Sequence, residues 1–176
     1  YFNTDGIEIS FDYKRYDDNC DFISRGRYFN FGMRNGKLII SYRVNLEKGR
    51  SYSVNENINY ELIKDDEFRN YRFTYNPNTG KGEVMVDGVV VWNYQGPKER
   101  GMFWKKTDNI IIGKNLNGGE TDKTILDNLI IRSTTHVQQM PITLLAFQAE
   151  ARDNHVMVSW FTSRETDIDS FVVERS

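Results

Sequence analysis

Apolar and polar residues alternate along most of the chain, and this pattern predicts short β-strands. The stretch GIEISFDYKRY places Ile7, Ile9, Phe11 and Tyr13 at every second position, with polar residues between them. Successive side chains of a strand point to opposite faces, so such a stretch presents one apolar face and one polar face. Further strands are predicted in FRNYRFTY, NIIIGKN and TILDNLIIRS, and no window has a convincing helical period.

Two short pairs of residues predict tight hairpin turns. Asp87-Gly88 lies inside VMVDGVVVWNY, and Asn35-Gly36 precedes KLIISYRV. Both central positions of such a turn need positive φ, which Asp, Asn and Gly tolerate. The cross-strand pairs predicted around the first turn are Val86–Val89, Met85–Val90, Val84–Val91 and Glu83–Trp92. The four valines at positions 84, 86, 89 and 91 then form a core face, and Trp92 lies on a mixed face. After the second turn, one face carries Leu38, Ile40, Tyr42 and Val44.

Many strands at short spacing predict an all-β protein. We expect an antiparallel jelly-roll β-sandwich over residues 1–136, followed by a connector at 137–141, because Pro141 cannot continue a central strand. Residues 142–176 contain three strand candidates, at 144–150, 155–161 and 171–175. Three strands leave two exposed edges and little core, so this segment is interpreted as the beginning of a second sandwich.

Charge and composition exclude several classes of function. The net charge is −2 and the charges are interspersed, which argues against a nucleic-acid partner. No apolar run approaches the roughly 20 residues that cross a bilayer, so membrane insertion is not expected. The chain begins at Tyr1, without a signal peptide, and is interpreted as a mature or truncated piece. Cys20 is the only cysteine and has no histidine nearby in sequence, which favours an inert thiol over a catalytic one.

Several stretches follow one another in an order typical of one superfamily. They are FRNYRFTY, the turn PNTGKG, the hairpin EVMVDG, the strand IIIGKN at 110–115 and the strand LDNLII at 126–131. Residues 1–135 thereby resemble the laminin G-like, or concanavalin A-like lectin, superfamily. Phe68 stands where that family usually has Trp, Met85 stands where Tyr is usual, and the customary first strand is missing before residue 1.

The last 36 residues have a second resemblance, to the fibronectin type III-like domain that precedes the sorting signal in many type IX secretion substrates. The matching residues are Pro141, Leu144, Phe147, Ala149, Val156, Val158, Trp160, Thr162, Glu165, Phe171, Glu174, Arg175 and Ser176. This resemblance implies a parent protein that is secreted or attached to the outer cell surface of a Gram-negative bacterium, with the secretion machinery as a partner.

The sequence contains no recognisable catalytic motif. Glucanases of the jelly-roll type carry a retaining carboxylate pair as E-x-D-x-x-E, whose spacing holds the carboxyl groups about 5–5.5 Å apart. The nearest stretch here, residues 120–125, lacks the last acid. A Ser-His-Asp triad or a histidine zinc site would need His136 or His155, both near or beyond the end of the first domain. We therefore predict no catalytic residues, although carboxylates from distant strands remain an alternative.

Clusters of acidic residues raise the question of calcium, which prefers oxygen ligands on loops. One cluster is formed by Asp17, Asp18 and Asp21, and another by Asn117, Glu120 and Asp122; Asp127 lies on the last strand of the first domain. The candidate ligands of a structural calcium ion are Asp18, Asp122 and Asp127. The alternative is that these acids only solvate turns, and no other cofactor is predicted.

Aromatic residues are the candidates for sugar binding, because a pyranose stacks its apolar face on Trp or Tyr and uses its hydroxyls for hydrogen bonds. The candidates are Trp92, Tyr94 and Trp104, with Asn93 and Asn109 near them in sequence, and Tyr28 and Tyr42 on facing strands. The alternative for each aromatic is a place in the core. For Trp104 we favour a loop residue that covers the core, and Trp160 is assigned to the core of the second sandwich.

Three functions follow as hypotheses. The first is a non-catalytic carbohydrate-binding or adhesive module with a glycan as partner. The second is a structural spacer that displays another domain and binds no small ligand. The third is a fragment of a polysaccharide-degrading enzyme. Exposed aromatics next to amide side chains would favour the first, a flat polar face the second, and two close carboxylates in a groove the third.

Overall fold

The computed structural model describes residues 4–104, 108–116, 125–134, 144–152 and 155–162. The chain divides into two compact units, Tyr1–His136 and Val137–Ser176, and each is described by itself. The strands of unit 1 are β1 (Gly6–Tyr13), β2 (Cys20–Arg25), β3 (Phe29–Arg34), β4 (Lys37–Asn45), β5 (Ser51–Glu61), β6 (Arg69–Asn76), β7 (Lys81–Val86), β8 (Val89–Gln95), β9 (Ile111–Lys114) and β10 (Leu126–Thr134). A 3-10 turn at Glu47–Gly49 lies between β4 and β5.

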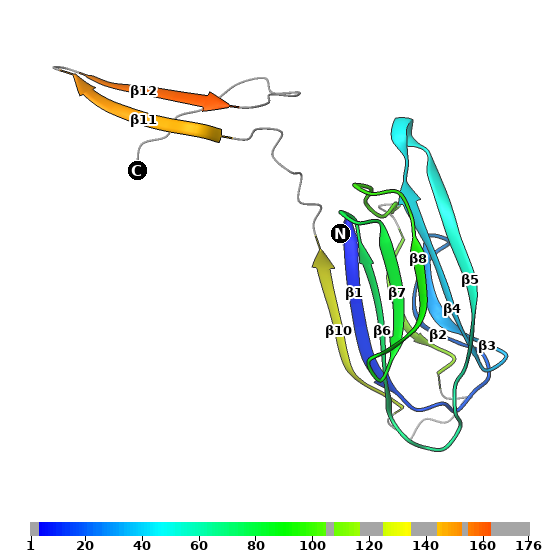
Figure 1. The fold of residues 1–176 in the computed structure, drawn as a ribbon. Coiled ribbons are helices and arrows are strands. Elements are labelled where there is room, and N and C mark those ends of the chain that lie inside the picture. Colours follow the sequence, from blue (N-terminus) through cyan, green and yellow to red (C-terminus); the bar gives the residue numbers. More distant parts are fainter. Residues whose placement is uncertain (1–3, 105–107, 117–124, 135–143, 153–154, 163–176) are drawn as a thin grey trace. The chain divides into compact units, whose positions relative to one another are not determined.

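The strands of unit 1 form two five-stranded sheets (Figure 1). The strand orders are β10-β1-β6-β7-β8 and β5-β4-β3-β2-β9. Within each sheet, every pair of neighbouring strands is antiparallel. The predicted all-β antiparallel sandwich is therefore confirmed. Each sheet has two edge strands, and the edges β5 and β8 lie close to each other.

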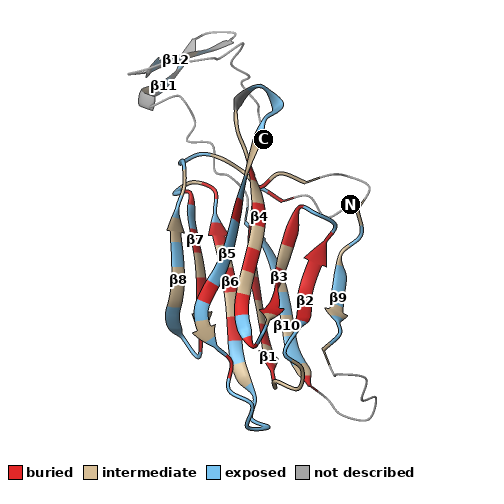
Figure 2. Cartoon of the chain, turned by 90° about the vertical axis from the view of Figure 1, so that its right-hand side faces the viewer, coloured by how far each residue is buried: buried red, intermediate tan, exposed pale blue. Residues whose placement is uncertain are grey.

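The core lies between the two sheets, where buried and less buried residues alternate along the strands (Figure 2). The inward residues of β1, Ile7, Ile9, Phe11 and Tyr13, are at most 3% exposed, as predicted. The same holds for the predicted inward faces of β4 and β6, which are Leu38, Ile40, Tyr42, Val44, Tyr71, Phe73 and Tyr75. Rings at the centre contact one another, with centroids 4.9 Å apart for Phe11 and Phe22. The alternation in the sequence therefore predicted the buried faces of three strands.

The turn between β7 and β8 forms at Asp87 and Gly88, whose φ angles are 48° and 79°. The pairs Val86–Val89 and Met85–Val90 are confirmed, but the register then shifts, so that Val84 pairs with Trp92 and Glu83 with Asn93. The predicted pairs Val84–Val91 and Glu83–Trp92 are wrong because Val91 is an extra residue on β8, which forms a bulge.

The bulge changes which residues of β8 face the core. Trp92 shares the inner face with Val84, and it packs against the core with part of its surface exposed. Val89, predicted to be a core residue, is 65% exposed because it lies at the tip of an edge strand. The other predicted turn, at Asn35 and Gly36, is present with φ angles of 50° and 75°.

Unit 2 contains an antiparallel pair, β11 (Leu144–Arg152) and β12 (His155–Thr162). Two of the three predicted strands of this segment are thereby confirmed, and the third, at residues 171–175, lies outside the described residues. Among the described residues, no helix is long and apolar enough to span a membrane.

Candidate functional site

Four aromatic side chains gather where the edge strands β5 and β8 approach each other. Trp92 and Tyr94 come from β8, Tyr52 from β5 and Tyr42 from the neighbouring strand β4. We call these four residues the edge aromatic cluster. The rings of Trp92 and Tyr94 are parallel within 6°, with centroids 6.3 Å apart, because residues two apart on a strand lie on the same face. Both are half-buried, so part of each ring is exposed.

Two glycines leave the space that this cluster occupies. A Cβ atom at Gly82 would meet the Tyr42 hydroxyl and would lie 3.5 Å from the Trp92 ring. A Cβ atom at Gly96 would meet the Tyr52 hydroxyl and would lie 3.1 Å from the Tyr94 ring. The two rings of β8 thus each lie beside a tyrosine from the other sheet, over a position without a side chain.

The tyrosines of the cluster differ in how far a ligand can reach them. Tyr42 is 0% exposed, and its hydroxyl has no hydrogen-bond partner among the described residues. Its ring is a core element, which corrects its assignment as a platform for sugar. Tyr52 is half-buried, and burial together with the neighbouring Tyr94 holds its pKa well above the ordinary value. Both phenols are therefore neutral hydroxyls at physiological pH.

Asn93 does not join the cluster, although it lies between Trp92 and Tyr94 in sequence. It is exposed and pairs with Glu83, so it faces the outer side of the sheet. Asn109 is exposed outside any strand. Of the seven candidate sugar-binding residues, the structure brings together Trp92, Tyr94 and the hydroxyl of Tyr42.

Tyr28 and Trp104 lie apart from the edge aromatic cluster. Tyr28 is 5% exposed, which excludes open stacking on a sugar and corrects its assignment; its ring centroid is 5.7 Å from that of Phe103. Trp104 is half-buried against the core and donates from Nε1 to the carbonyl oxygen of Thr4 at 2.7 Å. The guanidinium of Arg25 lies 5.0 Å from the centre of the Trp104 ring. The prediction that Trp104 is a loop residue covering the core is confirmed.

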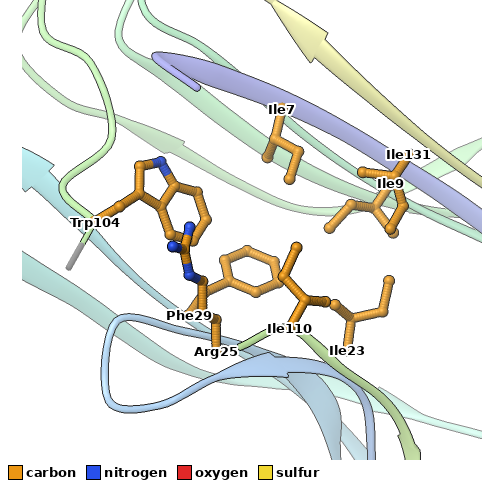
Figure 3. A pocket seen from close by; sticks show the side chains of 8 residues that line it. All are labelled: Ile7, Ile9, Ile23, Arg25, Phe29, Trp104, Ile110 and Ile131. Carbon is orange, nitrogen blue, oxygen red and sulfur yellow. The ribbon is translucent and has the colours of Figure 1, made fainter. Parts of the chain in front are cut away.

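A small cavity adjoins Trp104 between the two sheets (Figure 3). Its lining consists of Ile7, Ile9, Ile23, Arg25, Phe29, Trp104, Ile110 and Ile131. The cavity measures about 10 Å³, which is close to the minimum for one water molecule. A sugar ring does not fit there, so the cavity is a packing gap and not a binding site.

The acidic residues proposed as calcium ligands are separated or lie outside the described residues. Asp18 accepts a hydrogen bond from Arg15 at 2.6 Å, and this bond lowers the pKa of its carboxyl group. Asp21 lies within β2, paired with Arg34 at 2.5 Å, and so does not share a loop with Asp18. Asp127 is exposed on β10. Asp122 lies outside the described residues, as do Asn117 and Glu120. Within the described ranges no group of three potential ligands is found, and the calcium site stays a prediction.

The thiol of Cys20 is 1% exposed in the core. Burial raises its pKa to about 12, so the reactive thiolate is not formed at neutral pH. The interpretation of Cys20 as an inert residue is consistent with this environment.

Two arginines that flank Tyr28 were not predicted from the sequence. The guanidinium carbons of Arg27 and Arg43 lie 5.6 Å and 5.1 Å from the centre of the Tyr28 ring. Arg27 precedes Tyr28 in the turn before β3, whereas Arg43 comes from β4. The outward position of Arg43 in the alternation of β4 is the one signal that could have indicated this contact.

Comparison with known proteins gives similar structures only. No family model and no curated protein sequence matches the chain. The CBM40 domain of the Ruminococcus gnavus IT-sialidase, bound to alpha2,3 sialyllactose, is 13% identical; the match covers 74% of this chain and 76% of that chain, with a TM-score of 0.47. Botulinum neurotoxin type C, whose cell entry depends on interaction with two ganglioside molecules, is 12% identical; the match covers 74% of this chain and 33% of that chain, with a TM-score of 0.47.

The receptor-binding domain of botulinum neurotoxin type G is also 12% identical; the match covers 76% of this chain and 36% of that chain, with a TM-score of 0.44. The chain thus spans about a third of the length of these neurotoxin chains. Because all three TM-scores are below 0.5, these similarities carry no argument about the ligand of this chain.

Proposed function

We propose that unit 1 is a non-catalytic carbohydrate-binding module that binds a glycan at the edge aromatic cluster. The observation that carries this proposal is the parallel pair of half-buried rings, Trp92 and Tyr94, on one edge strand. The apolar face of a pyranose stacks on such rings. The rings are held in place by their own packing against the core, so little side-chain entropy is lost on binding.

Polar groups beside the two rings supply the second requirement of a sugar site. The Tyr52 hydroxyl lies beside the Tyr94 ring over Gly96. Its oxygen atom is buried and has no hydrogen-bond partner among the described residues, so a sugar must reach in beside the two edge strands to donate to it or accept from it. The combination of an apolar aromatic surface with a hydroxyl beside it is typical of sites for small uncharged ligands.

A glycan array with unit 1 in the full chain tests this proposal. We expect binding to at least one glycan, and a loss of at least about tenfold in affinity for Trp92→Ala and for Tyr94→Ala, because each removes half of the stacking surface. Phe68→Ala is the matched control, since Phe68 is an aromatic residue that is 41% exposed and belongs to a loop outside the cluster. Thermal unfolding of each variant separates lost binding from lost folding.

Two results would contradict the proposal. One is an array without any bound glycan, in the presence and in the absence of calcium. The other is unchanged binding by folded Trp92→Ala and Tyr94→Ala variants. A glycan that binds only with calcium would support a structural calcium ion as well, with Asp18, Asp122 and Asp127 as the ligands to replace.

We propose further that the module belongs to the laminin G-like, or concanavalin A-like, group and acts as an adhesin domain of a secreted or cell-surface bacterial protein. The resemblance of residues 141–176 to the fibronectin type III-like domain of type IX secretion substrates supports this context. Detection of the parent protein in the medium or at the cell surface, and its absence there in a secretion mutant, tests it.

A structural spacer is the second candidate, and the outer face of the sheet β10-β1-β6 favours it. Glu8 of β1 pairs with Arg72 of β6 and with Arg132 of β10, both at 2.9 Å. Four residues further along β1, Asp12 accepts hydrogen bonds from Asn70 at 2.8 Å and from Asn128 at 2.7 Å. This face satisfies its own polar groups and offers few free ones to a ligand. A spacer would give an empty glycan array and normal folding.

A further inference from the structure

The turn before β3 and the outer face of β4 together present two positive charges around one buried ring. Tyr28 is 5% exposed, and the guanidinium groups of Arg27 and Arg43 both lie within 6 Å of its centre. The Nε atom of Arg27 also donates to the Tyr28 hydroxyl at 3.4 Å. We call these three residues the arginine–tyrosine cluster. Contact with an aromatic face fixes the plane of a guanidinium, so its donors are already oriented.

Several other arginines of the same unit have a carboxylate partner. Arg34 pairs with Asp21, Arg69 with Asp65, and both Arg72 and Arg132 with Glu8. Arg27 and Arg43 form no ion pair with any described residue.

Arg43 is partly buried, so the lack of an ion-pair partner leaves its charge poorly compensated. Its Nε atom is buried and has no hydrogen-bond partner within the described part of the chain. A buried donor without an acceptor destabilises a structure. The carboxylate of Asp108 lies near Gly26, beside Arg27, and neutralises that charge in part. An anion from solvent cannot reach this buried Nε atom, so it would pair with the terminal Nη groups of Arg43, for which the described residues supply no ion pair.

We propose that the arginine–tyrosine cluster binds the carboxylate or sulfate group of an acidic saccharide. Arginine binds both groups through two parallel hydrogen bonds, which favours them over a neutral ligand. That the anion belongs to a saccharide rests on the proposed function of unit 1, whereas the anion site itself rests on the arginines.

Neighbouring side chains on the same outer face favour a saccharide over a simple ion. Ser41 lies two residues before Arg43 on β4 and pairs across the sheet with Asn30. Its hydroxyl donates to Asn55 of β5 at 2.6 Å. The Oδ1 atom of Asn30 is buried without a donor among the described residues. Of these residues, Asn55 is exposed, and its amide can both donate to and accept from a sugar hydroxyl beside Arg43.

The experiment measures binding of the full chain to heparin, which is sulfated, to polygalacturonate, which is carboxylated, and to dextran, which is neutral. We expect binding to at least one acidic polymer, weaker binding as the salt concentration rises, and a loss of about tenfold for Arg43→Gln and for Arg27→Gln. Arg43→Lys keeps the charge but not the paired hydrogen bonds, so it should also bind more weakly than the original chain.

Arg132→Gln is the matched control, because it removes the same charge from the other sheet. Its binding to acidic polymers should equal that of the original chain. The proposal is overturned if Arg132→Gln weakens binding as much as Arg43→Gln, if neither acidic polymer binds, or if duplex DNA or polyglutamate binds as tightly as the acidic polysaccharides. Thermal unfolding of every variant confirms that the compared proteins are folded.

Failure of this inference can be told apart from failure of the proposed function. If Trp92→Ala abolishes binding to a neutral glycan while the arginine variants bind acidic polymers normally, the anion site is refuted and the carbohydrate-binding module stands. If the glycan array is empty and polyglutamate binds through Arg43, the carbohydrate-binding proposal falls together with the saccharide as ligand.

Discussion

At the scale of single residues, Tyr42 and Tyr75 form a natural comparison. Their ring centroids are 5.4 Å apart, and each is at most 1% exposed. The Tyr75 hydroxyl donates to the carbonyl oxygen of Arg100 at 2.7 Å, whereas the Tyr42 hydroxyl has no partner in the described ranges. The two residues therefore differ mainly in whether a buried hydroxyl is satisfied.

We expect Tyr75→Phe to lower the free energy of unfolding by about 1 kcal/mol, because it removes a hydrogen bond and leaves a carbonyl without its donor. Tyr42→Phe should leave stability unchanged or raise it, because it removes an unsatisfied polar atom. Denaturant unfolding of both variants measures the difference. Equal losses for the two variants would mean that Tyr42 has a partner, such as a buried water molecule.

The sequence predicted the side of the strand on which most residues lie, but not their contacts. Alternation placed Tyr42 correctly on the inner face of β4, yet it gave no sign that its hydroxyl would lie beside Trp92 over Gly82. Trp92 itself was assigned to the wrong face, because one bulged residue reverses the alternation beyond it. The contact of Arg43 with Tyr28 depends on the pairing of two strands, so it could not be predicted from the sequence either.

At the scale of elements, the β7–β8 hairpin combines a turn that sequence specifies with a register that it does not. Gly88 has a φ of +79° with open space around it, whereas Gly82 lies under Tyr42 and Trp92. Gly88→Ala should destabilise by about 1–2 kcal/mol through the left-handed backbone alone. Gly82→Ala should cost about 1–3 kcal/mol through steric overlap.

Near-ultraviolet circular dichroism distinguishes these two effects. Gly82→Ala should change the aromatic signal, since Tyr42 and Trp92 must move, and Gly88→Ala should leave it as it is. A Gly82→Ala variant with an unchanged aromatic signal and full stability would show that the edge aromatic cluster is loosely packed around Gly82.

Strands that alternate clearly or follow a turn signal were predicted, and strands without such patterns were not. β5 was missed because only Val54 and Ile58 of its eleven residues are buried, as expected for an edge strand. β2 was missed for the opposite reason, since all six of its residues are buried. Asp21 within it is satisfied by Asn30 and Arg34, which come from the neighbouring strand. Both β5 and β2 therefore form through pairing with neighbouring strands, which the local sequence pattern does not reveal.

At the scale of the whole of unit 1, the core includes buried phenol rings that come from both sheets. Burial is the first cause that raises the pKa of Tyr13, Tyr42, Tyr52, Tyr71 and Tyr75, and for Tyr75 the value is about 12. Burial also raises the pKa of the Cys20 thiol, which lies between Tyr13 and Asp21. The folded unit therefore holds these groups protonated beyond the pH at which the unfolded chain releases its protons.

This difference predicts unfolding in alkali. A phenol whose pKa is raised in the folded state contributes its full stability below the unfolded pKa of about 10, and that contribution is lost as pH rises toward the folded value. The midpoint of thermal unfolding should thus fall steeply above about pH 10, with Cys20 starting the decline near pH 9. Phenolate absorbance should appear together with loss of the β-sheet circular dichroism signal. Tyr42→Phe should make the decline shallower, since one of the raised groups is removed. If the phenols ionised near pH 10 without any loss of structure, the tyrosine-rich core would be open to water, and the close packing of the two sheets around it would be refuted.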